Sequence, residues 1–315
     1  MTRVHDGLKR MDSKRVPHAG GKGIDADFIS SGSEQSTTIP LAEIGSSRRS
    51  DPDSFLNSAH SCGWDPDPDV LLRFDSKEAV PGTEEFRALR ASLYQIRERI
   101  HLRRILISSA VASEGRSFMA ANVAQVMACQ HGCRTLLLDA DLRAPSLHLA
   151  LGTSATPGLS DYLLGEVNDS DIIQRGTIDN LFFVPAGRLV SGQSELLSNG
   201  HLKTFLDGVS SLFDWIIIDS TAALAVSDTA IIANYCEGAL MIVRANSTPF
   251  DVVFKAREKI RADRILGVVL NQIRSDFQKG GHSAQPDSSG IVQEWKLNRK
   301  FSAAQPRTRK ETQAG

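Results

Sequence analysis

Short apolar runs alternate with helical stretches between residues 103 and 273, and this alternation constrains the fold more than any other feature of the sequence. Each run spans at most ten residues and is apolar at nearly every inner position, which is typical of strands buried on both faces of a parallel sheet. Strands that alternate with helices predict an α/β fold, a doubly wound and mostly parallel sheet flanked by helices, with ligands outside the carboxyl ends of the strands. The clearest runs are RRILISSA, CRTLLLDA, NLFFVPAG, DWIIIDS, GALMIVRA and RILGVVLNQI, and the clearest helical stretches are 83–100, 117–132, 201–213, 227–235 and 250–262.

The two ends of the 315-residue chain differ in composition from its middle. Of the first 70 residues, 32 are Ser, Gly, Pro or Asp, and from Phe277 onward only six side chains are large and apolar. Such segments bury too little apolar surface to offset the entropy lost on ordering the backbone. We therefore predict a disordered leader over 1–79, one globular domain over 80–275 and a disordered basic tail over 276–315.

Charge and hydropathy exclude several classes of protein. The 36 basic and 37 acidic side chains nearly balance, so we expect no nucleic acid among the partners. No apolar run approaches the roughly 20 residues that span a bilayer, and the N-terminus lacks the apolar core of a signal peptide. We expect a cytoplasmic protein, with its basic tail either solvated or in contact with anionic lipid or an acidic partner.

The segment from Ser108 to Phe118 joins the first strong strand to its helix, where a P-loop would surround phosphates with backbone N–H groups. It matches the pattern G-x-x-x-x-G-K-[ST] at two positions, Gly115 and Ser117. Ala110 replaces the first Gly, and Arg116, whose planar guanidinium is larger than an ammonium, replaces the Lys. By itself the segment predicts a nucleotide site or an ordinary strand–helix turn about equally.

Three aspartates follow strands that come after this loop. Asp139 and Asp141 end the run LLLDAD, and Asp219 ends WIIIDS. The carboxyl ends of parallel strands share one edge of a sheet, and hard carboxylate oxygens are what Mg²⁺ prefers. Each aspartate could instead be a helix N-cap or turn residue, but three such positions after the loop favour a magnesium site.

The ordered set of motifs resembles the deviant P-loop ATPases and, within them, the cytoplasmic domain of the bacterial tyrosine kinase (BY-kinase) family, which serves capsule and exopolysaccharide assembly. The resemblance covers about 190 residues, from the first motif near residue 84 to VVLNQI. Its landmarks are Glu84-x-x-Arg87-x-x-Arg90, SSAVASEGRS, LLLDADLRAP with Asp139, Asp141, Arg143 and Pro145, GLSDYLLGE, VPAG, SELLS, FDWIIIDS with Asp219, then Asp228 and Asn271.

The resemblance assigns roles to these residues and implies ATP and Mg²⁺ as cofactors. Ser117 and Asp139 would hold magnesium, with Asp219 beside it, and Asp141 would be the catalytic carboxylate that accepts the proton of the acceptor hydroxyl. Asp139 and Arg116 would complete the catalytic set, Arg116 by taking the place of the phosphate-binding Lys. The residues that would bind the nucleotide are Ser113, Glu114, Gly115, Arg116, Ser117, Phe118 and, at the adenine, Asn271.

The sequence departs from the family pattern at this site and in the tail. Ala112 and Ser113 replace a Pro-Gly pair, Phe118 replaces a second hydroxyl residue, and Ser220-Thr221-Ala222 replace Thr-Pro-Pro. The family's C-terminal tyrosine cluster is missing, because no tyrosine follows Tyr235. Misplaced charge is costly in phosphoryl transfer, so we predict weak or lost activity and no tyrosine autophosphorylation of the tail.

Three hypotheses on function and assembly stay open. The first is a kinase-family nucleotide-binding domain that regulates polysaccharide polymerisation and export with a membrane chain-length or export regulator. The others are a non-catalytic pseudokinase scaffold and a positioning ATPase of the partitioning type. Glu84, Arg87 and Arg90 lie near one helix face, where they would either pair within the helix or form the contact of a homo-oligomer, or of a hetero-oligomer with a family kinase.

Overall fold

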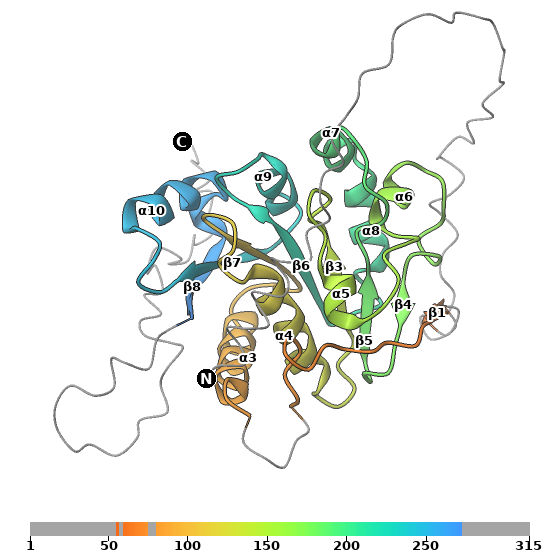
Figure 1. Ribbon diagram of the computed structural model, residues 1–315, viewed down its shortest axis with the longest axis horizontal. Coiled ribbons are helices and arrows are strands. Elements are labelled where there is room, and N and C mark those ends of the chain that lie inside the picture. The colour runs from red at the N-terminus through yellow and green to blue at the C-terminus, as the bar shows by residue number, and fades with distance from the viewer. Residues whose placement is uncertain (1–54, 57–58, 75–79, 273–315) are drawn as a thin grey trace, which may run out of the picture.

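The alternating runs form one eight-stranded sheet with helices on both faces in the computed structural model, which describes residues 55–56, 59–74 and 80–272 (Figure 1). The strand order is β1-β4-β5-β3-β6-β2-β7-β8, and the pair β4·β5 is the antiparallel one among the described residues. The predicted doubly wound, mostly parallel sheet is therefore confirmed. No helix in the described ranges is both long enough and apolar enough to cross a membrane.

The elements agree with the predicted runs to within a few residues, and further short elements and a 3-10 turn lie between them. The strands are β1 (His60–Ser61), β2 (Arg104–Ser109), β3 (Thr135–Asp139), β4 (Gln174–Arg175), β5 (Leu181–Val184), β6 (Trp215–Ala222), β7 (Gly238–Arg244) and β8 (Ile265–Asn271). The helices are α3 (Thr83–Arg97), α4 (Arg116–Ala128), α5 (Leu147–Leu151), α6 (Leu159–Leu163), α7 (Gln193–Ser198), α8 (His201–Val209), α9 (Asp228–Ala233) and α10 (Phe250–Lys259), with the 3-10 turn η2 (Ala262–Arg264).

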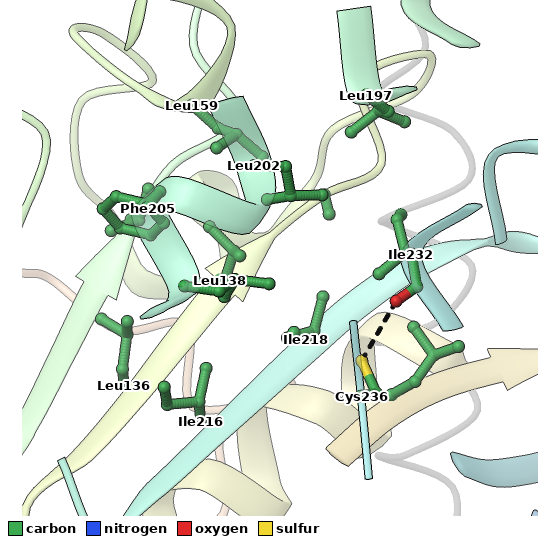
Figure 2. Packing of buried hydrophobic residues seen from close by; sticks show 14 of the residues in the cluster. Leu136, Leu138, Leu159, Leu197, Leu202, Phe205, Ile216, Ile218, Ile232 and Cys236 are labelled. Atoms are coloured by element: carbon green, nitrogen blue, oxygen red, sulfur yellow. Dashed lines mark hydrogen bonds between the residues drawn. The ribbon is translucent and has the colours of Figure 1, made fainter. Parts of the chain in front are cut away.

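Both faces of the central strands are buried, as their continuous apolar character predicts. Side chains alternate across a strand, so Leu136 and Leu138 of β3 face one core while Leu137 between them faces the other. The first core lies under α6, α7, α8 and α9, as Figure 2 shows for Phe205 and Ile232. Each fully buried Leu or Ile contributes about 1.5–3 kcal/mol to the stability of the fold.

The second core lies between the sheet and the helices α3, α4 and α5. Phe86 and Leu89 of α3 pack there against Met119 and Val123 of α4, the helix that follows the predicted phosphate loop. Because α4 is buried along most of its length, its first turn is held rigidly at the end of β2.

Residues 59–74 differ from the predicted leader, because they pack on the domain. Trp64 is buried against Phe183, and the Leu72 N–H donates to Oδ1 of the buried Asn122 at 2.8 Å. The composition of this stretch is polar, but its few apolar residues reach the second core. Apart from residues 55–56, the remainder of the predicted leader and the predicted tail lie outside the described residues.

Candidate functional site

The sheet topology brings the predicted loop and the aspartates to one edge. Strand β6 lies between β3 and β2, and Asp219 is the register partner of both Asp139 on β3 and Ile107 on β2. The three strands are parallel, so their carboxyl ends and the loop that leaves β2 gather together. This juxtaposition agrees with the site expected from the sequence.

The loop between β2 and α4 has the backbone conformation of an anion-binding turn. Ser113 and Gly115 have positive φ angles of 63° and 88°, which turn successive N–H groups toward the space before α4. Gly115 is the N-cap of α4 and forms no side-chain cap hydrogen bond. The N–H groups of Arg116, Ser117 and Phe118 in the first turn are thus available to an oxyanion.

Two of the predicted nucleotide-binding residues, Glu114 and Phe118, have side chains that are used elsewhere, which leaves their backbone groups to face the site. The Phe118 ring is buried and packs against the ring of Phe86 at 6.1 Å. The Glu114 carboxylate is buried and accepts hydrogen bonds from the Val111 N–H at 2.9 Å, the Arg244 N–H at 3.0 Å and the Thr248 hydroxyl at 2.6 Å. Glu114 therefore ties the loop to the end of β7.

Asn271, at the end of β8, lies beside the same loop. Its Nδ2 donates to the Glu114 carbonyl at 2.9 Å, and its Oδ1 accepts from the Gln272 N–H at 2.9 Å. The structure thus places the residue predicted to contact adenine at the loop, with its amide fixed by the backbone. Contact of Asn271 with a base stays a prediction.

Arg116 points back into the site rather than toward solvent. Its Nε donates to the Ser220 carbonyl at 2.8 Å and its Nη1 to the Ser109 hydroxyl at 2.9 Å. Its Nη2 lies 3.4 Å from Oδ2 of Asp141, and its side chain is 13% exposed. The guanidinium therefore bridges the ends of β2 and β6 and pairs with the carboxylate predicted to be catalytic.

The two aspartates that are register partners, Asp139 and Asp219, are completely buried, and the pKa of each is raised. Burial, with the nearby Asp219 and Asp141 carboxylates, raises the pKa of Asp139 well above its usual value. Burial also raises the pKa of Asp219 to about 7, although Arg116 and a hydrogen bond from Ser117 act to lower it. Two buried carboxylates side by side need a cation to be ionised together, which is the environment of a metal site.

The residues present fit magnesium. In the described part of the chain, no group of three or more His, Cys, Asp or Glu side chains could hold a metal ion. The set predicted from the sequence is smaller and consists of two carboxylates and one hydroxyl. Magnesium commonly takes one or two carboxylates and completes its shell with water and phosphate oxygens. Asp139, Asp219 and the Ser117 hydroxyl, which bonds to Asp219, satisfy that requirement.

Asp141 is oriented by the loop that follows β3. Its Oδ1 accepts from the N–H groups of Arg143 at 3.2 Å and Ala144 at 3.0 Å, while Oδ2 faces Arg116. Arg143 in turn pairs with the buried Asp228 of α9 at 2.7 Å. The spacing of Arg143 from Asp141 was visible in the sequence, but its partner lies 85 residues away and only the fold brings them together.

Asp228 stays ionised although it is buried. Burial alone would raise the pKa of Asp228, but the hydrogen bonds from Arg143 and Ser194 outweigh it and hold the pKa below its usual value. Ser194, on α7, is the first residue of the motif SELLS, but nothing in the sequence indicates its contact with Asp228.

The predicted oligomerisation residues on α3 contact their own domain. Glu84 and Arg87 form an ion pair within the helix, and Arg87 Nη2 also donates to the Phe74 carbonyl at 2.9 Å. Arg90 Nη1 donates to the Val126 carbonyl of α4 at 2.9 Å. The alternative of pairing within the helix is confirmed for Glu84 and Arg87, and a contact between subunits remains a prediction.

Comparison with curated proteins gives relatives of one kind, although no family model matches the chain. Tyrosine-protein kinase CpsD of Streptococcus agalactiae serotype III (strain NEM316) is 32% identical over 212 residues, which are 66% of this chain and 90% of the relative. Tyrosine-protein kinase YwqD of Bacillus subtilis (strain 168) is 30% identical over 191 residues, 60% of this chain and 80% of the relative.

Solved structures give the same result. The crystal structure of the chimerical protein CapA2B2 matches with a TM-score of 0.61 and 26% identity over 68% of this chain and 93% of that one. The kinase domain of the Escherichia coli tyrosine kinase ETK matches with a TM-score of 0.61 and 25% identity over 69% and 85% of the two chains. The fold and the sequence therefore point to the same group of proteins.

Proposed function

This chain belongs to the bacterial tyrosine kinase family of capsule and exopolysaccharide biosynthesis, and we propose that it binds Mg-ATP at the loop between β2 and α4 and transfers its phosphoryl group slowly. The first-turn N–H groups of α4 would hold the phosphates, and Asp139, Asp219 and Ser117 would hold the metal. When bound, magnesium would neutralise charge on the phosphates. The Asn271 amide would meet the adenine.

The observation that supports slow transfer is the contact between Arg116 and Asp141. Asp141 is suited to accept the proton of an acceptor hydroxyl, because two N–H groups fix one of its oxygens and leave the other facing the site. The Arg116 guanidinium occupies that second oxygen at 3.4 Å. A carboxylate paired with a cation is a weaker base, and a guanidinium held by Ser109 and Ser220 is less free to follow the phosphates.

The same contact favours a second candidate function, a non-catalytic scaffold. If Arg116 stays on Asp141 when nucleotide is present, the domain would keep the family fold and regulate the export machinery by binding alone. The partitioning-type ATPase has no comparable support, since the curated relatives are named as tyrosine kinases.

In the cell we propose that the domain works beside a membrane chain-length or export regulator, at the inner face of the membrane. The exposed Glu84 and the half-buried Arg87 on α3 would contact a neighbouring subunit in an oligomer. The segment 59–74, which packs on the ATPase-like domain, would belong to it.

Binding of a fluorescent ATP analogue, with and without Mg²⁺, tests the proposal. We expect the wild type to bind more tightly with Mg²⁺, Asp139→Asn to lose that dependence, and the control Asp207→Asn, far along the chain on α8, to keep it. Arg116→Lys should raise the rate of ATP turnover about tenfold or more, because a compact ammonium releases Asp141. Binding by the wild type without turnover in either Arg116 form would favour the scaffold, and the absence of binding in both forms would refute a nucleotide site.

A further inference from the structure

An ion pair with a buried carboxylate joins the loop that carries Asp141 to helix α9. Arg143 Nε lies 2.7 Å from Asp228 Oδ2, and Nη2 lies 3.1 Å from Oδ1, so the guanidinium and the carboxylate meet through two hydrogen bonds. The Asp228 side chain is 0% exposed, whereas that of Arg143 is 36% exposed. Two parallel hydrogen bonds fix the direction of a side chain as well as its distance.

A third element completes this network. Ser194 of α7 donates to Asp228 Oδ1 and accepts a hydrogen bond from Arg143 Nη2 at 3.0 Å. The buried carboxylate thus has its hydrogen-bonding capacity filled from two sides, which a buried charge requires. The loop after β3 is held simultaneously by α7 and α9.

The same turn of α9 also holds the end of β6. The Thr229 hydroxyl donates to the Thr221 carbonyl at 2.7 Å, two residues beyond Asp219. One helical turn therefore contacts both strand ends that carry the site's carboxylates, β6 directly and β3 through Arg143.

Arg143 links this network to Asp141 through its own backbone. The N–H groups of Arg143 and Ala144 both donate to Asp141 Oδ1, at 3.2 and 3.0 Å. The residue that orients the Asp141 carboxylate is thus the residue whose side chain is anchored on Asp228. Without the ion pair to Asp228, the turn that contains Arg143 is no longer held in place. The Asp141 carboxylate can then rotate, since its other side-chain contact, to Arg116, is long at 3.4 Å.

We infer that Arg143 and Asp228 are positioning residues, which hold the Asp141 carboxylate in the orientation needed at the nucleotide site. The importance of that orientation for phosphoryl transfer rests on the proposed function. The anchoring itself does not, and it can be measured on the protein without nucleotide.

Hydrogen exchange measured residue by residue tests the anchoring. In Asp228→Asn, which keeps the shape but not the charge, we expect the amides of Arg143 and Ala144 to exchange about tenfold faster, because one lost charge-assisted contact is worth about that much in local opening. Exchange in α4 should stay unchanged. Asp207→Asn is the matched control, because it breaks a 2.7 Å pair with Arg104 elsewhere in the domain.

Kinetics distinguish a positioning role from a structural one. We expect Asp228→Asn to lower kcat about tenfold or more with KM for Mg-ATP changed less than about threefold, and Arg143→Lys, which keeps the charge, to recover part of that loss relative to Arg143→Met. Unchanged exchange at Arg143 and Ala144, or equal acceleration throughout the domain, would overturn the inference. If the wild type turns over no ATP, the proposed function fails while the exchange result still decides the anchoring.

Discussion

Replacing Asp219 with Asn should stabilise the protein at neutral pH, although it removes a residue of the site. Asp219 is buried beside Asp139, and burial raises its pKa from 3.8 to about 7. Ionising this carboxylate therefore costs free energy in the folded protein, whereas in the unfolded chain it does not. Asn has nearly the same shape and can still accept the Ser220 N–H hydrogen bond.

The sign and size of the effect follow from the two pKa values. Between about pH 4 and pH 7 the folded state keeps a proton that the unfolded state has lost, so the stability contributed by this group falls as the pH rises through that window. The pKa of Asp219 differs by about three units between the unfolded and folded states, and at about 1.4 kcal/mol per unit this corresponds to about 4 kcal/mol of stability. We expect the free energy of unfolding of Asp219→Asn to exceed that of the wild type by up to about 4 kcal/mol above pH 7, and by close to nothing near pH 4.

Urea unfolding of both proteins from pH 5 to pH 8.5, without divalent metal, measures this difference. The exposed Asp251→Asn is the control and should change the free energy of unfolding by less than about 0.5 kcal/mol at every pH. A stability difference between Asp219→Asn and the wild type that does not grow with pH would refute the argument that burial disfavours the ionised form of Asp219.

Three further outcomes are expected. Adding Mg²⁺ at pH 8 should stabilise the wild type but not Asp219→Asn, as thermal unfolding would reveal, because the cation offsets the buried charge. Asn122→Leu should lower the free energy of unfolding by about 2–4 kcal/mol in urea titrations, since the Leu72 N–H and the Val70 carbonyl both lose a buried partner; unchanged stability would show that residues 59–74 add little. Gly176→Ala would place a Cβ 1.8 Å from the Trp64 ring, so we expect a loss of about 2–3 kcal/mol and a red-shifted tryptophan emission; an unshifted spectrum would contradict this packing.

The sheet and its site edge could be predicted because the relevant information is local. A strand buried on both faces must be apolar along most of its length, and the polar residues toward its carboxyl end, such as Asp139 in β3 and Asp219 in β6, mark that edge of the sheet. The loop before α4 could be placed for the same reason, since it lies between a strand and a helix that are both evident in the pattern.

The segment 59–74 packs on the domain although its composition predicts disorder, because composition averages over a whole stretch. The many Ser, Gly, Pro and Asp residues of the first 70 positions outweigh Trp64 and the short apolar run Val70-Leu71-Leu72. What orders this segment is the buried Asn122 amide and the Phe183 ring, far along the chain. A contact of that kind leaves no periodicity in the sequence.

By itself, then, the sequence determined the layered α/β architecture, the family and the edge at which carboxylates and phosphate loop meet, because these follow from residue patterns along single strands and loops. Tertiary structure alone decided which groups pair there. Arg116 on Asp141, Asp139 beside Asp219, and Arg143 on Asp228 join residues 25 to 85 positions apart. Hydrogen bonds and buried charge act over a few ångströms in space, whatever the separation in sequence, so only the packed fold could show that the cation of the loop already contacts the carboxylate it would serve.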